Sequence, residues 1–271
     1  MNIAKNRRMP KETLNLLAND FSEEVLIALS GNPGATEETL ADLAKRKSTR
    51  IRWGVAGNTS ASEETLDMLS KSKKLYIRCS VAENPKAGKR TLDRLANDPN
   101  VNVRIAVANN PSTADYTLAR LAKDPDVKVR IAVASNPHTP RESLKDLAND
   151  ENLNVVLAVA GNTNTPKDTL DYLADSLDDE VKLKVAENKK TSAKTLAKLS
   201  KDKCICVRKA VAQNETTSQD TLDELANDEA VSVRIAVAQN INTRRRTLYV
   251  MKKDPNEKVS LSAMNNLVLK M

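Results

Sequence analysis

Residues 101–110, with the sequence VNVRIAVANN, decide the fold, because close versions of this stretch recur at a fixed interval along the chain. Steps of 26 residues in both directions from Asn110 reach an asparagine every time, at Asn6, Asn32, Asn58, Asn84, Asn136, Asn162, Asn188, Asn214, Asn240 and Asn266. Self-similarity at one period indicates a solenoid, in which each repeat packs mainly against its neighbours. We therefore expect one solenoid domain, residues 1–271, with ten repeats that begin at the asparagines from Asn6 to Asn240 and a partial terminal element at 266–271.

Each repeat contains two predicted helices. The first carries an apolar stripe such as Leu118, Leu121 and Ala122, whose spacing of i, i+3 and i+4 gives one buried and one charged face. The second, residues 101–109 in the quoted copy, has almost no polar face and must be buried on two sides, like the inner helix of a stacked α-solenoid. A β-strand is the competing interpretation, because the stretch is rich in β-branched residues. The alanine pair and the asparagine at the expected C-terminal cap favour a helix.

Capping residues place the ends of these helices. Thr139-Pro140 is typical of an N-cap followed by proline at the first helical position, and Glu142 would complete a capping box. Asp98-Pro99 predicts the start of a second helix in the same way. We expect the repeating asparagine to cap the second helix locally, since helical layers lie too far apart for direct contact between asparagines of adjacent repeats.

The complete repeat, N-P-x-T-P-x-x-x-L-x-x-L-A-x-D-P-x-x-x-V-R-x-A-V-A, resembles the variant leucine-rich repeat, and its D-P…V-R half resembles the HEAT repeat of armadillo-type folds. Residues 110–135 carry the motif most fully, whereas residues 136–161 have Val156 in place of the arginine. The resemblance implies an all-α, right-handed solenoid of about ten two-helix repeats with a concave binding surface. It also implies that one element of each repeat is a 3₁₀ segment. The chain contains no cysteine-rich cluster-binding segment, so the resemblance implies no cofactor.

Composition narrows the functional classes. The net charge of +7 is spread unevenly, and the most basic repeat, residues 188–213, lies between the two most acidic ones. A nucleic-acid groove would show a continuous basic stripe instead. Cys79, Cys204 and Cys206 form no framework of spaced pairs, and His138 is the single histidine, so we expect no metal site and a reducing, cytoplasmic setting. The sequence has no long apolar run, which argues against a membrane partner.

An arginine stands six residues before the repeating asparagine in most copies, at Arg52, Arg78, Arg104, Arg130, Arg208 and Arg234. A helical wheel places this position away from the polar face, and a buried guanidinium needs a partner. Four of these arginines are preceded, six residues earlier, by Asp98, Asp124, Asp202 and Asp228, as in the Asp/Arg pairs of HEAT repeats. Arg52 and Arg78 lack that aspartate, so they are predicted to be the members free for a ligand.

The exposed position of the second helix gives the candidate binding surface, which comprises Arg50, Tyr76, Asn102, Lys128, Asn154, Glu180, Cys206, Ser232 and Lys258. Its N-terminal half, through Asn154, is basic to neutral, and nearby turns add Arg46 and Lys73 where other copies have Asp-Pro. This half suits an acidic or anionic partner, although the same residues also suit a solvated charged face. Trp53 is expected in the core, because its position holds Ile, Leu or Cys in the other copies except Lys209.

We interpret the chain as a non-enzymatic scaffold that binds a protein or peptide along its concave helical face. The partner-binding residues would be Arg46, Arg50, Arg52, Lys73, Tyr76, Asn102, Lys128 and Asn154. A nucleic-acid-binding solenoid that uses the basic N-terminal half is the alternative. The sequence offers no Gly-rich phosphate loop and no nucleophile with a base at a recognisable spacing. The apolar C-terminal residues 267–269 predict either end-to-end homo-oligomers or a tail, residues 256–271, that folds back over the final layer.

Overall fold

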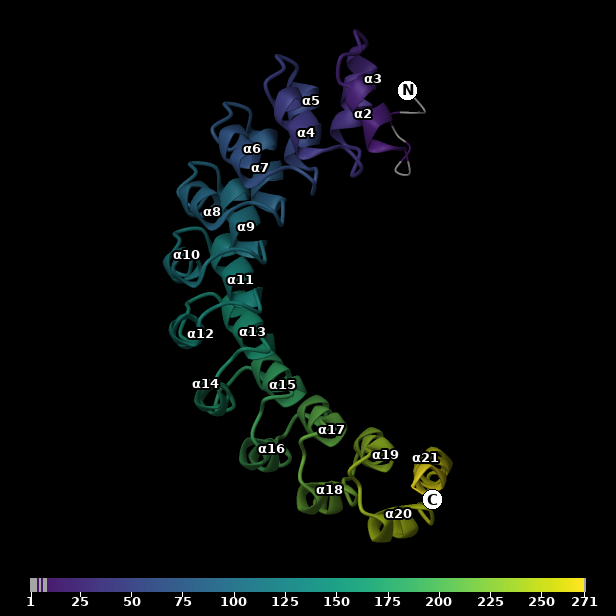
Figure 1. Ribbon diagram of the computed structural model, residues 1–271. Coiled ribbons are helices and arrows are strands. Elements are labelled where there is room, and N and C mark those ends of the chain that lie inside the picture. The colour runs from purple at the N-terminus through teal and green to yellow at the C-terminus, as the bar shows by residue number, and fades with distance from the viewer. Residues whose placement is uncertain (1–3, 5, 7–8, 271) are drawn as a thin grey trace. The chain divides into compact units, whose positions relative to one another are not determined.

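A computed structural model describes residues 4, 6 and 9–270, and its contacts group the chain into two compact units, residues 1–139 and 140–271 (Figure 1). The first unit contains α2 (Lys11–Leu17), α3 (Glu23–Ser30), α4 (Glu37–Ala44), α5 (Thr49–Ala56), α6 (Glu63–Leu69), α7 (Leu75–Glu83), α8 (Lys89–Leu95), α9 (Val101–Asn109), α10 (Asp115–Leu121) and α11 (Val127–Ser135). That the two units together form one solenoid domain stays a prediction.

The second unit contains α12 (Arg141–Leu147), α13 (Leu153–Gly161), α14 (Lys167–Leu173), α15 (Asp179–Glu187), α16 (Ala193–Leu199), α17 (Ile205–Gln213), α18 (Gln219–Leu225), α19 (Val231–Gln239), α20 (Arg245–Met251) and α21 (Glu257–Leu269). The residues that the structure describes form no strand and no 3₁₀ helix. The all-α prediction is confirmed, whereas the first element of each repeat is a short α-helix instead of the 3₁₀ segment that the resemblance implied.

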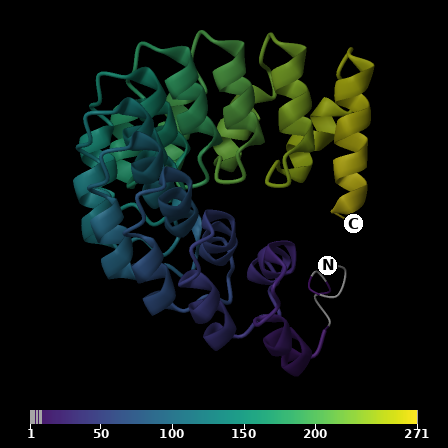
Figure 2. The same ribbon diagram turned by 90° about the horizontal axis from the view of Figure 1, so that it is seen from above.

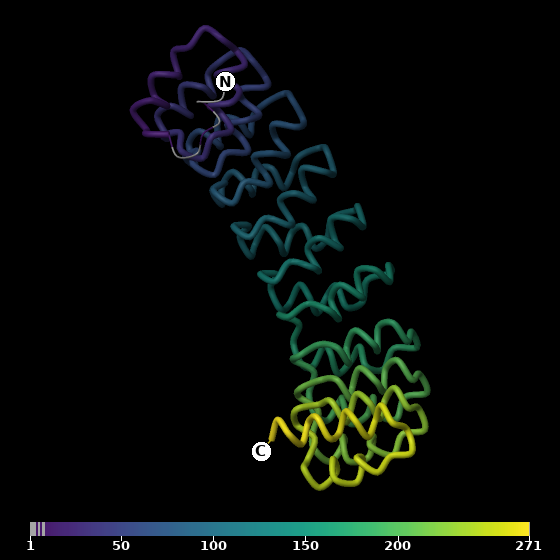
Figure 3. Tube along the Cα trace, turned by 90° about the vertical axis from the view of Figure 1, so that its right-hand side faces the viewer, coloured from purple at the N-terminus to yellow at the C-terminus, as the bar shows by residue number. Residues whose placement is uncertain are grey.

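Within each unit the helices stack in two rows. The even-numbered first helices form one row and the odd-numbered second helices form the other (Figure 1). The layers follow one another in chain order, as the Cα trace shows for each unit (Figure 3). Helix α9 packs against α7 and α11 in its own row and against α8 and α10 in the other. This confirms the predicted solenoid of two-helix repeats.

Both rows of helices contribute to the core, and the second helices bury the broader face. In α9 the side chains of Val103, Ala106, Val107 and Ala108 are buried, as expected for a helix with neighbours on several sides. A first helix buries a narrower stripe, and in α10 this comprises Thr117, Leu118 and Leu121. Small and β-branched side chains at the second-helix positions allow the layers to approach closely without leaving voids.

The residue that caps the start of the first helix differs from the predicted one. Pro140 itself is the N-cap of α12, and the Thr139 hydroxyl donates to the carbonyl of Val133 at 2.5 Å, on the end of the preceding second helix. Thr113 makes the same bond to Val107 at 2.6 Å. The threonine therefore closes the last turn of the second helix and does not start the next helix, so neither the predicted N-cap nor the capping box is present at Thr139.

The start of the second helix was also predicted too early. Helix α9 begins at Val101, and its N-cap is Asn100, whose side chain accepts from the backbone N–H of Asn102. Asp98 lies in the turn before it, where its carboxylate accepts from the backbone N–H of Asn100 at 2.9 Å. The aspartate thus shapes the turn between the two helices, and this position is important for the candidate site below.

The repeating asparagine does occupy the C-cap of the second helix, but its side chain also links adjacent layers. The Asn110 amide donates to the carbonyls of Ala82 and Asn84 in the preceding repeat, at 2.6 and 2.9 Å, and its Oδ1 accepts from the Ser112 N–H at 2.8 Å. The prediction that asparagines of adjacent repeats cannot touch was wrong. It considered only contact between side chains, whereas the amide reaches the main chain of the next layer.

First helices are tied together by a second set of polar bonds. The buried Thr117 hydroxyl donates to the carboxylate of Asp93 in the previous first helix at 2.9 Å, and Thr91 contacts Asp67 in the same way at 2.9 Å. Arg94 also binds Asp67, with 2.6 Å between Nη2 and Oδ1. This arginine holds the pKa of Asp67 well below its usual range, although partial burial acts in the opposite direction. Each row therefore has its own polar ladder.

The C-terminal residues do not fold back. Helix α21 stacks on α19 as an ordinary second helix, and the Asn266 amide donates to the carbonyls of Ala238 and Asn240 at 2.8 and 2.9 Å. The predicted terminal element from residue 266 is the continuation of α21 through Leu269, while Met271 lies outside the described residues. Figure 2 shows α21 as the last layer of the second unit. The alternative of a folded-back tail was therefore wrong.

Candidate partner-binding surface

The arginine column is paired, but with partners in the next repeat. Arg104 makes a two-pronged ion pair with Asp124, with 2.7 Å between Nε and Oδ2 and 3.0 Å between Nη2 and Oδ1. Its Nη1 donates to the main-chain carbonyl of Asp98 at 3.0 Å. The guanidinium therefore lies between the turn of its own repeat and the turn of the following one. The prediction that the aspartate six residues earlier supplies the carboxylate was wrong, since that residue contributes only its carbonyl.

Arg78 is paired in the same way, so it is not free for a ligand, contrary to the prediction. Arg78 Nε lies 2.6 Å from Asp98 Oδ2, and both side chains are largely buried. Burial acts to raise the pKa of Asp98, but the hydrogen bonds from Arg78 and from the Asn100 N–H outweigh it and lower the pKa. Arg208 and Arg234 are paired likewise with Asp228 and Asp254.

Arg52 is the exception within the first unit. The residue 20 positions further on, which is an aspartate for Arg78 and Arg104, is here Ser72. The Nε of Arg52 is buried and has no hydrogen-bond partner among the residues that the structure describes. Ser72 keeps the local function of the aspartate, because its hydroxyl accepts from the Lys74 N–H at 3.2 Å. It cannot supply the carboxylate, so Arg52 Nε lacks the acceptor present in the Arg78 and Arg104 layers, and that Arg52 binds a ligand stays a prediction. The prediction that Arg78 is free was wrong.

The exposed residues of the second helices in residues 1–139 form a separate surface, which we call the second-helix face. Its members are Arg50, Trp53, Tyr76, Asn102 and Lys128, and the predicted position of the second helix is exposed in every one of these layers. Between α7 and α9 the face has a shallow depression of about 410 Å³, which Asn102 helps to line. The prediction that this column faces solvent is confirmed.

Trp53 lies on this face and not in the core. Its side chain is 54% exposed, and it meets Tyr76, which is 43% exposed, edge to face with 6.2 Å between ring centroids. The core prediction was wrong because the position of Trp53 borders the exposed column, and in α9 the corresponding Ile105 is only partly buried. An exposed tryptophan and tyrosine in contact are notable in a chain with 2% aromatic residues.

The other predicted site residues are not all brought together. Arg50 is exposed near the aromatic pair and forms an ion pair with Glu24 at 2.9 Å. Arg46 donates to the carbonyl of Ala18 at 3.1 Å, next to the first-helix row, so it does not join Tyr76. Lys73 is exposed in the turn before α7. Asn154 is exposed at the start of α13. It belongs to the second unit and is therefore not a member of the second-helix face, which is defined within residues 1–139.

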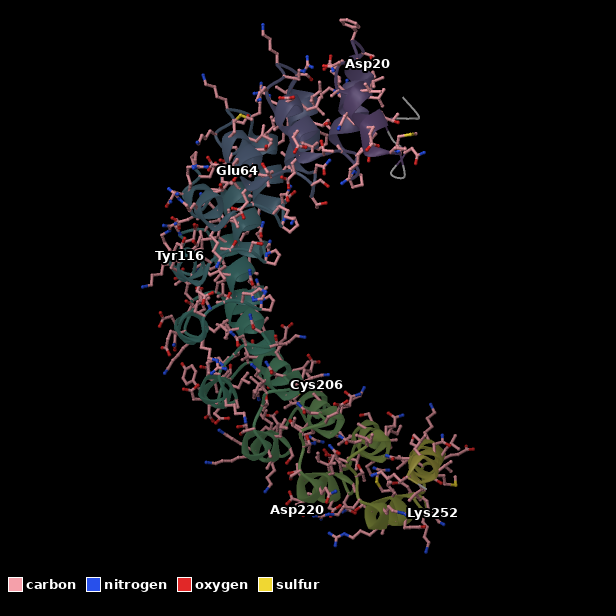
Figure 4. All side chains as sticks on the ribbon, viewed as in Figure 1. Asp20, Glu64, Tyr116, Cys206, Asp220 and Lys252 are labelled. Atoms are coloured by element: carbon pink, nitrogen blue, oxygen red, sulfur yellow. A yellow bond between two sulfur atoms is a disulfide. The ribbon has the colours of Figure 1, made fainter. Side chains whose placement is uncertain are left out.

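The cysteines give a result that the sequence did not suggest. A disulfide joins Cys204 to Cys206, with 5.3 Å between the Cα atoms, and Cys206 lies on the second helix α17 (Figure 4). Cysteine usage therefore gives less support to the predicted cytoplasmic setting, which stays a prediction. The described part of the chain holds no group of three metal-ligating side chains. None of its helices is long and apolar enough to cross a membrane.

Comparisons with known proteins agree with the motif. A family model described as leucine rich repeat variant matches residues 127–152. A solved structure described as a leucine-rich repeat variant with a novel repetitive protein structural motif aligns with 82% of this chain and 88% of its own, at 24% identity and a TM-score of 0.59. An engineered protein aligns at 14% identity over 97% of this chain and 98% of its own, with a TM-score of 0.40, and importin beta aligns at 12% identity over 94% and 40%, with a TM-score of 0.37. A comparison with curated proteins found no match.

Proposed function

We propose that this chain, a helical-repeat solenoid of the leucine-rich repeat variant type, is a non-enzymatic scaffold that binds a protein or peptide through the second-helix face. The observation that carries the proposal is the exposed contact between Trp53 and Tyr76. Tryptophan, tyrosine and arginine are the residues most enriched at the energetic centres of protein interfaces. Arg50, one turn before Trp53 on α5 and exposed, supplies the third of these types.

The charge around the pair favours an acidic partner. Lys73 and Lys74, in the turn before α7, are exposed and have no ion-pair partner among the described residues. Positive charge on the rim of an interface raises the association rate with an acidic partner and contributes less to the final affinity. We therefore expect an acidic segment with at least one apolar or aromatic side chain that contacts Trp53.

Single-stranded nucleic acid is the second candidate, and the same aromatic pair favours it. Bases stack on exposed tryptophan and tyrosine side chains, and neighbouring lysines attract the backbone. The two candidates differ in their response to salt, since a nucleic-acid complex loses affinity steeply as salt is added.

The test is affinity capture with the tagged chain from its native lysate, with and without nuclease, followed by identification of the retained molecules. The Trp53→Ala variant is compared with Tyr116→Ala, because Tyr116 is equally exposed but lies on the first helix α10 (Figure 4). For an identified protein, Trp53→Ala should weaken binding by at least about 30-fold, the effect of a 2 kcal/mol hot spot. Equal affinities of the two variants would refute the proposal, and recovery that disappears with nuclease would replace it by the nucleic-acid alternative.

A further inference from the structure

We propose that Arg52 is the centre of a binding site for a phosphate monoester, located where the turns at residues 45–48 and 71–74 meet. This site lies at the turn edge of the solenoid and does not depend on the second-helix face being the surface that binds a protein. Its ligand would take the place that an aspartate side chain takes in neighbouring repeats.

The geometry of the paired arginines defines what Arg52 lacks. In the Arg104 layer, the guanidinium binds a carbonyl of its own turn and both carboxylate oxygens of Asp124 in the next turn. A charged hydrogen-bond acceptor is therefore the usual occupant of this position. Arg52 has the same place in its repeat, and its buried Nε has no acceptor among the described residues. A buried donor without an acceptor is costly, so an oxyanion would be bound favourably once the guanidinium turns and brings Nε into contact with it.

The second unit shows what happens when the pair is lost without a replacement. There Val156 stands in the arginine position and Ser176 in the aspartate position, so both members have changed together. The Ser176 hydroxyl accepts from the Asp178 N–H at 3.1 Å, as Ser72 does from Lys74. In the Arg52 layer only the acid has been replaced, and the cation remains. This difference indicates an external acceptor.

The surrounding charge selects a dianion. The turn before α5 contains Lys47, and the turn before α7 contains Lys73 and Lys74; these three lysines are exposed and form no ion pair with a described residue. Together with Arg52 they outnumber the nearby carboxylate of Glu23, which accepts from Ser48, whereas in the Arg104 layer one carboxylate balances the arginine. A phosphate monoester carries close to two negative charges at neutral pH and offers three acceptor oxygens. It therefore fits this position better than a carboxylate.

The experiment uses methyl phosphate as the probe and the full chain. Methyl phosphate is titrated at constant ionic strength, and binding is measured as a saturable shift of the Arg52 Nε–Hε resonance and as a saturable rise in the melting temperature. Ser72→Asp places a carboxylate opposite Arg52 and should abolish the response; Arg52→Leu, which has no Nε–H, is followed by the melting temperature alone. Ser176→Asp is the matched control, because it makes the same change in the same column opposite Val156, and it should respond like the unmodified chain. We expect Arg52→Leu to raise the dissociation constant by at least about tenfold, as for loss of one charge-assisted hydrogen bond.

Three outcomes would overturn the proposal. They are an absent response in the unmodified chain, an unchanged response in Ser72→Asp, and acetate binding as tightly as methyl phosphate, which would remove the argument for a dianion. Trp53→Ala should leave the response to methyl phosphate intact. A failure of this site is thereby distinguished from a failure of the protein-binding proposal, which depends on Trp53.

Discussion

Replacement of Asn110 by alanine tests whether the asparagine column stabilises the contacts between layers. The Asn110 side chain makes three hydrogen bonds, to the carbonyls of Ala82 and Asn84 and from the N–H of Ser112. The carbonyl of Ala82 depends on this amide. The next residues that could donate to it are Pro85, which has no N–H, and Lys86, whose N–H is bound to the side chain of Asn84.

The expected cost follows from these bonds. Three hydrogen bonds at about 1 kcal/mol each give about 3 kcal/mol, and the carbonyl of Ala82, left without a donor, adds to this cost. Loss of a purely local cap would cost only about 1 kcal/mol. The assay is urea unfolding followed by circular dichroism at 222 nm, with the slope of the transition checked for a change in cooperativity.

A matched variant separates the two contributions. Asn110→Asp keeps the oxygen that accepts from Ser112 but replaces the donor to Ala82 and Asn84 by a second oxygen. If the bonds between layers dominate, Asn110→Asp is at least as destabilising as Asn110→Ala at neutral pH. The reasoning is refuted if Asn110→Ala costs about 1 kcal/mol and Asn110→Asp restores most of that loss.

Two further predictions concern acid and self-association. Because the pKa of Asp98 is lowered in the folded chain, its pair with Arg78 stabilises the fold fully above the unfolded value of about 4 and is lost as the pH falls through the folded value. The difference in unfolding free energy between the unmodified chain and Asp98→Asn should therefore shrink as acid is added below pH ~4, and a difference that is constant with pH would contradict this. The exposed apolar stripe of Leu261, Met264 and Val268 on α21 predicts concentration-dependent self-association. Met264→Glu should reduce it in sedimentation equilibrium, and a chain that stays monomeric at all concentrations would refute it.

The period of the sequence was sufficient to predict the helical repeats but not to assign the partners within them. Asp98 stands six residues before Arg104 and 20 residues after Arg78, and a 26-residue repeat makes these two pairings equivalent in most copies. The ends of the column could have distinguished them. Arg78 has no aspartate six residues earlier but has one 20 residues later, and Asp254 is followed six residues later by Ser260 instead of an arginine. Both exceptions require the pairing with the next repeat that the structure shows.

The position of Trp53 could not be obtained from its column alone. Ile, Leu and Cys at the same position in other copies suggested a core residue, but a half-buried position at the border of an exposed face accepts the same side chains. How far one layer covers the next decides the exposure of such a position, and this depends on packing between helices distant in sequence. The aromatic contact with Tyr76 therefore became visible only in the structure.

The Arg52 layer has lost the carboxylate of the pair but kept the cation, and this is the strongest argument for a ligand. A repeat that only needed to fold could replace the arginine together with the aspartate, as the layer of Val156 and Ser176 does. In the Arg52 layer the acid is lost and the cation is retained among lysines, an arrangement that destabilises the turn edge through an unsatisfied donor and unbalanced charge. An anion that binds there offsets both costs at once. Stability gained by Ser72→Asp and affinity lost by the same variant would be two measurements of one interaction.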